Sequence, residues 1–194
     1  MSDAGFGLSL TTDYDAEELT LLTDAASEEI VPLITQVGFL ELVDFSGVED
    51  VPVEGDCVLT SAQEERYPNQ QLCLSPLTAS DGGPFETVIT GDGVINAEAS
   101  LAAGSPGQWQ VTITFDDETS VTLGDFTEAH IGQALAVVLD GEVISVPVIQ
   151  ARVDEQAVIS GDFSAGEARH LAQILNSDAL PFMVQMIGIS SHPE

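Results

Sequence analysis

"LAVVLDGEVISVPVIQ", residues 135–150, is the stretch that decides the fold. Asp140 and Gly141 stand between two runs rich in β-branched residues. This is the strongest short-range signal for a β-hairpin, because a type I′ turn requires positive φ at both central residues. We therefore predict paired strands over 133–139 and 142–146, turning at Asp140 and Gly141. Both runs are apolar on both faces, so other elements must cover them. The polar residues in the middle exclude a membrane span, which needs an uninterrupted apolar run of about 20 residues.

The end of this hairpin supplies a candidate contact surface. Pro147 cannot donate a ladder hydrogen bond, so it marks a strand end or an exposed sheet edge. Unpaired strand edges accept extended peptides as additional strands. Val146, Pro147 and Val148 are therefore the candidate peptide-contact edge.

The composition limits the partners that the chain can have. Its 194 residues suffice for one domain or for two closely packed subdomains. Only three residues are basic, Arg66, Arg152 and Arg169, against 33 acidic ones, which gives a net charge of −30. Such a surface repels nucleic acid and anionic lipid, so we expect no nucleic acid partner. The acidity suits either a solubilising surface in a salty setting or a face that binds a basic partner or calcium.

The N-terminus and the cysteines bear on the compartment. "MSDAGFG" has neither the basic nor the apolar part of a signal peptide. The chain is thus either cytoplasmic or an extracytoplasmic domain whose leader and anchor have been removed. Cys57 and Cys73 lie in one loop-rich region and are a disulfide candidate, the alternative being two separate buried thiols. Without a C-x-x-C pattern or a neighbouring histidine, a metal site there is not favoured.

The sequence pattern divides the chain into three consecutive segments. The first is residues 1–45. Alternation in "GFGLSLTTD" predicts a strand, and 37–45 predicts a second, buried one. Between them, Asp15 and Glu18 resemble a capping box that opens a helix ending near Pro32. We expect a base-like strand–helix–strand segment.

Residues 46–86 form the second segment, which we call the insertion. Proline, glycine and acidic residues dominate it, and both cysteines lie in it. Loops of this length are usually functional or specially braced. We expect one or two short strands here and a second candidate contact surface.

The third segment, 87–194, alternates strand and helix patterns. Strands are expected in "TVITGDGVINAEASL", "QWQVTITF", "AVISGDF" and "LPFMVQMIGI", and helices in "DDETSVTLGDFTEAHIGQ" and "SAGEARHLAQILN". Ser164 and Glu167 form the best capping box in the chain. The order lacks strict βαβ alternation, so we predict an α+β fold: a mixed, mostly antiparallel sheet with helices packed on one face, containing the Asp-Gly hairpin and the loop-rich insertion.

No stretch carries a catalytic signature. The sequence has no nucleophile elbow, no dinucleotide or phosphate-binding glycine motif and no H-E-x-x-H. His130 and His170 fit helix surfaces. Asp92, Asn96 and Glu98 lack the order of an EF-hand loop. We predict no catalytic, cofactor-binding or metal-binding residues, and no enzyme.

Five segments carry a resemblance to a known family: "VITGDGVINAEAS", "WQVTITFDDE", "FTEAHIGQALAVVLDGEVISVPVIQ", "VISGDFSAGEARHLAQIL" and "ALPFMVQ". Over about 87–183 the chain resembles the head subdomain of the first periplasmic domain of SecD, a subunit of the protein-export translocase (the SecDF family). The resemblance implies an α+β domain outside the cytoplasmic membrane that holds the emerging polypeptide. In the family, transmembrane helices couple proton flow to its movement. "NSDALP" departs from the family pattern, and so does the cysteine-bearing insertion.

The resemblance implies a non-enzymatic, extracytoplasmic polypeptide-binding domain of SecD type, accessory to protein translocation. Its partners would be unfolded or extended polypeptide, or membrane-embedded translocase subunits. This chain would not insert into the membrane directly; a removed anchor, or transmembrane segments outside it, would tether it at the periplasm or cell surface. The alternative is a SecD-like fold reused as a structural or adhesive component of a cell-surface or membrane-associated assembly.

Overall fold

The computed structural model of the chain describes residues 8–13, 18–23, 37–68, 72–102 and 107–177. The chain divides into two units, one of residues 1–36 with 184–194 and one of residues 37–183. In the first unit, strands β1 (Leu8–Asp13) and β2 (Glu18–Thr23) pair antiparallel with each other.

The predicted helix opening at Asp15 and Glu18 is wrong over the residues that the structure describes, because β2 occupies Glu18–Thr23. After Glu18, the run "ELTLLT" alternates leucine and threonine over Leu19, Thr20 and Leu21, a pattern that suits a strand. Pairing with β1 along all six residues overrides the local capping signal. The rest of that helix and the predicted closing strand from 180 onward lie outside the described residues.

The larger unit contains a four-stranded sheet around the predicted hairpin. Its order is β4–β3–β7–β8, and every neighbouring pair is antiparallel. The strands are β3 (Leu40–Asp44), β4 (Thr87–Thr90), β7 (Leu135–Leu139) and β8 (Glu142–Ser145). Between β7 and β8, Asp140 has φ of 52° and Gly141 has φ of 83°, the left-handed values that the turn requires.

A second sheet of three strands completes the unit. It contains β5 (Val94–Leu101), β6 (Trp109–Phe115) and β9 (Gln156–Phe163) in the order β5–β6–β9, again antiparallel. The α+β class and the antiparallel pairing are confirmed, but the strands form two sheets in this unit rather than one. The 3₁₀ turn η1 (Gly91–Gly93) separates β4 from β5, so that β5 pairs with β6 instead of extending β4.

Three helices are described, none of them long and apolar enough to cross a membrane. They are α2 (Ser61–Arg66), α3 (Asp117–Ala129) and α4 (Ala165–Leu175). The capping box of Ser164 and Glu167 is present at the start of α4. α2 lies within the insertion, where we expected only short strands.

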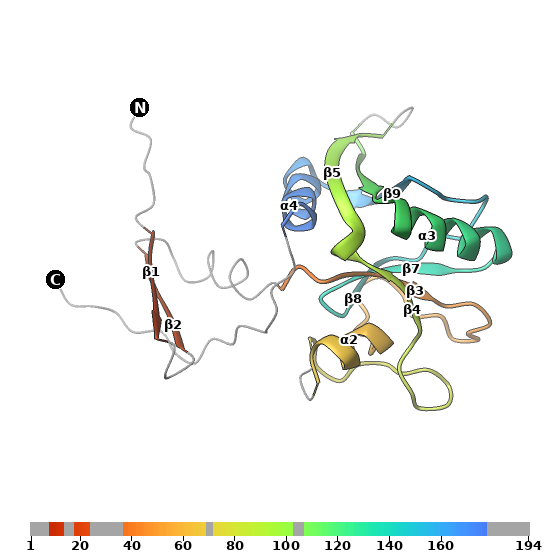
Figure 1. Ribbon diagram of the computed structural model, residues 1–194, viewed down its shortest axis with the longest axis horizontal. Helices are drawn as coiled ribbons and strands as arrows, with labels where there is room; N and C mark the ends of the chain where they lie inside the picture. Colours follow the sequence, from red (N-terminus) through yellow and green to blue (C-terminus); the bar gives the residue numbers. More distant parts are fainter. Residues whose placement is uncertain (1–7, 14–17, 24–36, 69–71, 103–106, 178–194) are drawn as a thin grey trace. The chain divides into compact units, whose positions relative to one another are not determined.

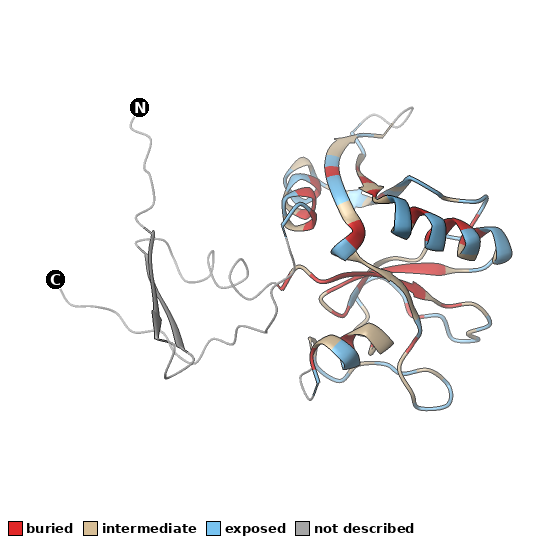
Figure 2. Cartoon of the chain, viewed as in Figure 1, coloured by how far each residue is buried: buried red, intermediate tan, exposed pale blue. Residues whose placement is uncertain are grey.

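Two separate hydrophobic cores cover the hairpin, one on each face of the sheet. Alternate residues of β7 point to opposite faces of the sheet, and all five are buried. One face packs against α3, α4 and the three-stranded sheet; it includes Leu135, Val137 and Leu139. The other packs against Val58 and Phe85 of the insertion; it includes Ala136 and Val138. Figure 1 shows α3 and α4 on one side of the four-stranded sheet and α2 on the other. Burial along β7 is continuous in Figure 2.

Candidate functional site

The insertion is bound to the hairpin by backbone hydrogen bonds. Gly55 N–H donates to Val143 O at 2.9 Å, and Val143 N–H donates to Asp56 O at 2.9 Å. Val58 N–H donates to Gly141 O at 2.8 Å. Residues 55–58 therefore act as an additional strand on the outer side of β8. The edge of the sheet is covered at 141–143, which protects it from pairing with other chains there.

The predicted disulfide between Cys57 and Cys73 is present, with 6.0 Å between the two Cα atoms. It lies against the hairpin turn, where Cys73 Sγ is 3.4 Å from Gly141 O. A side chain at Gly141 would meet Cys73 Sγ at 3.0 Å, so glycine there serves both the turn and the close approach of the bridge. The bridge thus joins two parts of the insertion at the point where the insertion meets the β7–β8 turn.

Asp140 has a second role besides its place in the turn. Its carboxylate accepts the backbone N–H groups of Val37, Gly38 and Phe39, at 3.0, 3.2 and 2.8 Å. Burial raises the pKa of Asp140, while the three N–H donors oppose that rise. The hairpin turn therefore fixes the residues that lead into β3.

Glu41 is a buried carboxyl group at the junction of β3, β4 and the insertion. Its side chain is fully buried and accepts hydrogen bonds from three neutral donors. Thr60 Oγ1 is one donor, Gln63 Nε2 donates at 2.8 Å and Thr87 Oγ1 donates at 2.8 Å. Burial raises the pKa of Glu41, the three hydrogen bonds lower it, and the Asp140 charge raises it further. Glu41 was not among the predicted site residues, although a single acid within the apolar run "VGFLELV" is a signal for a buried polar group.

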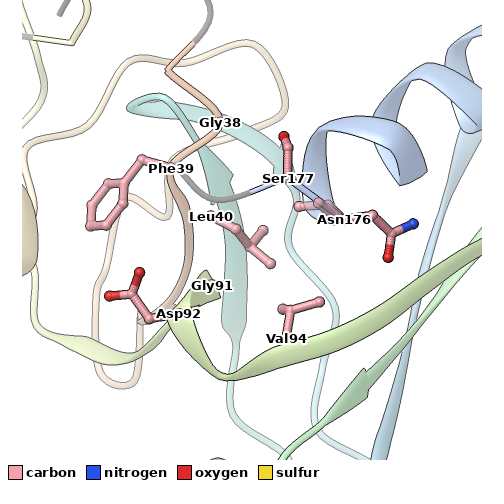
Figure 3. A pocket seen from close by; sticks show the side chains of 9 residues that line it. Gly38, Phe39, Leu40, Gly91, Asp92, Val94, Asn176 and Ser177 are labelled. Atoms are coloured by element: carbon pink, nitrogen blue, oxygen red, sulfur yellow. The ribbon is translucent and has the colours of Figure 1, made fainter. Parts of the chain in front are cut away.

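A small cavity lies between the start of β3, η1 and the end of α4 (Figure 3). Its volume is about 50 Å³, and Gly38, Leu40, Gly91, Asp92 and Ser177 are among its lining residues. That volume can hold a few water molecules but is too small for a long peptide side chain. The cavity is therefore a packing feature rather than a binding site.

Among the residues that the structure describes, the predicted contact edge has a backbone partner on one side only. Leu135 N–H donates to Pro147 O at 3.0 Å, and Ile149 N–H donates to Gln133 O at 2.9 Å. These bonds flank the bridge between Ala134 and Val148, so the N–H and C=O of Val148 point away from Ala134. The side chain of Gln150 reaches Val148 O at 3.3 Å.

The three side chains of this edge differ in exposure. Val146 is partly buried and packs against the core beneath the insertion. Pro147 is exposed, and 49% of Val148 is exposed. Exposed apolar side chains also lie near the disulfide: Val53 at 63%, Leu74 at 92% and Leu77 at 45%. Val148 lies beyond the end of β8, opposite Ala134, whereas Leu74 adjoins the disulfide at the turn of the hairpin.

Other polar groups have structural partners. His130 stacks on Phe126 with ring centroids 4.0 Å apart, and its Nδ1 lies 2.8 Å from Phe126 O. Arg66 pairs with Asp92 at 2.8 Å and lies over the Phe39 ring. Over the described residues, no three side chains of histidine, cysteine, aspartate or glutamate are placed to hold a metal ion.

Comparison with known proteins gives one consistent result. A model of the SecDF P1 head subdomain matches residues 69–182, which begins inside the insertion and earlier than the resemblance placed it. The protein translocase subunit SecD of Aquifex aeolicus is 40% identical over 169 residues, covering 77% of this chain and 33% of that protein. The SecD of Desulfurispirillum indicum is 30% identical over 216 residues, covering 91% of this chain and 42% of that protein.

Solved structures agree with the sequence relatives. A structure described as "Structure and function of a membrane component SecDF that enhances protein export" matches with a TM-score of 0.62 at 26% identity, covering 97% of this chain and 85% of that one. A crystal structure of SecDF in a super-membrane-facing form matches with a TM-score of 0.60 at 28% identity, covering 84% of this chain and 22% of that one. This chain spans about a third of the length of the Aquifex aeolicus relative.

Proposed function

The chain belongs to the SecDF P1 head subdomain family, and on that premise we propose that it is a non-enzymatic, extracytoplasmic polypeptide-binding domain that assists protein translocation. Its partner is an unfolded or extended polypeptide, or the membrane-embedded subunits of the translocase. The domain acts by contact rather than by chemistry: it holds a chain without changing it. Membership of this family supports protein translocation as the process. The strand edge at residues 146–148 supports the proposed mode of binding.

The proposed mode of binding is based on the outer side of residues 146–148. There the backbone of Val148 points away from its partner strand, next to exposed Pro147. An extended polypeptide can add to such an edge through main-chain hydrogen bonds, which tolerate many sequences. Main-chain recognition suits a domain that must hold different proteins in turn. Leu74 and Val53 of the insertion are further exposed apolar side chains, and Leu74 adjoins the disulfide at the turn of the hairpin.

Site-specific photocrosslinking tests the proposal. A photoreactive residue placed at Val148 or Leu74 is expected to crosslink to a stalled, secreted polypeptide. Gln173 on α4 is the control, because it is exposed but lies on a helix, which has no strand edge to which a polypeptide can add. Crosslinks at Val148 and Leu74 but not at Gln173 support the proposal. Equal crosslinking at all three positions, or none with the domain in its membrane context, contradicts it and leaves the structural or adhesive role.

A further inference from the structure

Strand β9 lies at one edge of the three-stranded sheet, whose order is β5–β6–β9. Phe115 N–H donates to Glu155 O at 2.9 Å, just before the first residue of β9. This bond fixes which residues of β9 bond to β6, because hydrogen-bonded and non-hydrogen-bonded pairs alternate in an antiparallel ladder. The register is unbroken over 156–160, so the N–H and C=O groups of three residues point away from β6: Gln156, Val158 and Ser160.

These outward groups, which we call the outer edge of β9, are open to pairing. No hydrogen bond within the described part of the chain reaches the backbone N–H or C=O groups of the three residues on that side. All three residues are exposed, and 51% of Val158 is exposed. The edge therefore offers donors and acceptors in the spacing that an extended chain requires.

The other edge strands of the two sheets in this unit have partners on their outer sides. On β5, the side chain of Asn176 binds Ala97 N–H and Ala97 O at 2.8 and 2.7 Å. Residues 55–58 cover β8, and on β4 Thr87 N–H donates to Ser61 Oγ at 2.9 Å. The outer edge of β9 differs from all three.

The sequence of β9 also lacks the devices that usually prevent strand addition. Proteins protect exposed edges with lysine, proline, a bulge or a covering segment. Residues 156–160 read "QAVIS", without lysine or proline, and their pairing with β6 contains no bulge. An edge of this kind is suited to accept another strand.

Charge is confined to the two ends of this edge. Glu155 and Asp162 are exposed, and none of the ion pairs among the described residues includes either of them. The six residues between them, "QAVISG", are uncharged. The edge thus has a neutral middle between two negative ends.

This charge pattern disfavours a second copy of the chain as the added strand. An antiparallel pair of β9 strands centred on Val158 would set Asp162 of one copy opposite Asp154 of the other, with Glu155 next to it. The two-fold symmetry of such a pair repeats the arrangement at both ends. Like charges opposite each other destabilise strand pairing, whereas basic residues at these positions would stabilise it.

We propose that the outer edge of β9 accepts an extended polypeptide as an added strand, and that it prefers a neutral stretch with lysine or arginine at both ends. The backbone of Gln156, Val158 and Ser160 pairs with the middle of this stretch. Glu155 and Asp162 attract its basic ends. That the partner is a polypeptide in transit rests on the proposed function, whereas the open edge and its charge pattern belong to the structure itself.

The test uses three octapeptides with one shared neutral middle and with lysine, glutamine or glutamate at both ends. Each is titrated into the full chain at about 0.15 M salt, where the Debye length is about 8 Å, and followed by NMR. The lysine peptide is expected to shift the amide signals of 156, 158 and 160. It should bind about tenfold more tightly than the glutamate peptide, with the glutamine peptide between them.

Val158→Pro tests whether the main chain makes the contact. Proline removes the outward N–H but no ladder bond to β6, and edge strands tolerate it at such positions. Affinity for the lysine peptide should fall about tenfold or more. Val158→Thr keeps the N–H and the β-branched shape, so its affinity should stay within about twofold. Circular dichroism checks folding, and Gln156→Pro, at the first residue of β9, replaces a variant that unfolds.

The main rival explanation is general attraction of any cation to a chain with a net charge of −30. Val158→Pro leaves that charge unchanged, so a lysine peptide that binds this variant as tightly as the wild type overturns the proposal. Glu155→Gln with Asp162→Asn should bring the three affinities within about threefold of one another. Glu65→Gln with Glu86→Gln is the matched control, because it removes two exposed acids of the insertion. An equal effect in that control also overturns the proposal.

The outcomes separate this inference from the proposed function. If the lysine peptide shifts 156–160 while Val148 gives no crosslink, the outer edge of β9 stands and the contact edge at 146–148 is wrong. If Val148 crosslinks and no peptide shifts 156–160, the proposed function stands and this inference is wrong. No binding and no crosslink contradicts both. A dimer in sedimentation that Val158→Pro dissociates would make a second copy the occupant, against the inference.

Discussion

The side-chain amide of Asn176 pairs with the backbone of Ala97 as a neighbouring strand would. Ala97 N–H donates to Asn176 Oδ1 at 2.8 Å, and Asn176 Nδ2 donates to Ala97 O at 2.7 Å. Nδ2 also donates to Ala172 O at 2.8 Å. One side chain therefore covers part of the outer edge of β5 and caps the end of α4, which ties the helix to the sheet.

Asn176→Ala should lower the free energy of unfolding by about 1–3 kcal/mol, because it leaves the Ala97 groups without their partner. Asn176→Asp should cost more, since a carboxylate cannot donate to Ala97 O or Ala172 O. Urea denaturation followed by circular dichroism measures both. Gln173→Ala on the exposed side of α4 is the control and should change stability little. An alanine variant as stable as the control would show that the amide contributes nothing.

Leu171→Ala should cost about 2–5 kcal/mol of stability. The side chain belongs to the core between α4 and the sheets, and only 7% of it is exposed. Chemical denaturation gives the value. A loss within about 0.5 kcal/mol, as for an ordinary surface site, would mean that α4 does not pack as described.

Gly93→Ala should destabilise the fold, whereas Gly166→Ala should not. A Cβ at Gly93 would lie 2.7 Å from Thr119 Cβ, in the first turn of α3, so the helix or η1 must shift. A Cβ at Gly166 meets nothing nearer than 3.8 Å, and alanine is the better helix former by about 0.5–1 kcal/mol. Thermal denaturation compares the two. Equal effects would contradict the close approach of η1 to α3.

Replacing Cys57 and Cys73 by alanine should lower stability by roughly 3 kcal/mol, the value expected for a closed loop of this size. Loss of the bridge should loosen the insertion, so cleavage by proteases should rise within residues 56–81. The strands β7 and β8 and the helix α4 should stay protected, because Glu41 and the backbone hydrogen bonds of residues 55–58 still hold the insertion to the sheet. Limited proteolysis with mass spectrometry locates the cuts. Cleavage spread evenly over the larger unit would show that the bridge supports the whole core.

Glu41→Gln should change how stability depends on pH. Burial places the folded-state pKa of Glu41 above the ordinary value of 4.5, so the folded chain holds the proton over a wider range than the unfolded chain. The stability that this group contributes is therefore fully present below about pH 4.5 and is lost as pH rises through the raised pKa.

The difference in unfolding free energy between the wild type and Glu41→Gln should accordingly shift in favour of the variant as pH rises from 4.5 to 8. Using the difference cancels the repulsion among surface acids, which both proteins share. Urea titrations at each pH supply the values. Asp140→Asn is a useful comparison, because burial raises the pKa of Asp140 in the same direction. A difference that does not vary with pH would mean that the Glu41 pKa is not raised.

Local chemistry was enough to predict several elements. The hairpin turn depends on the φ angles of Asp140 and Gly141 alone, and the start of α4 depends on hydrogen bonds between Ser164 and Glu167. Both signals lie within four residues. The same kind of signal failed at Glu18, where pairing with β1 decided the outcome.

The candidate site could be predicted only in part. Proline at 147 indicated a strand end, but the sequence could not show that residues 133–135 pair with one side of that edge or that 55–58 cover β8.

By itself, the sequence determined the hairpin, the capped helix, the disulfide candidates, the acidic surface and, through its resemblance, the family. Each of these depends on neighbouring residues or on the composition of the whole chain. Only the tertiary structure decided that the strands of the larger unit form two sheets and that Asp140 binds Val37, 103 positions away. It likewise buried the side chain of Glu41 and placed Thr60, Gln63 and Thr87 around it as hydrogen-bond donors. Contacts between distant residues leave no periodic trace in a single sequence, because the free energy that selects them arises only once the separate elements have packed.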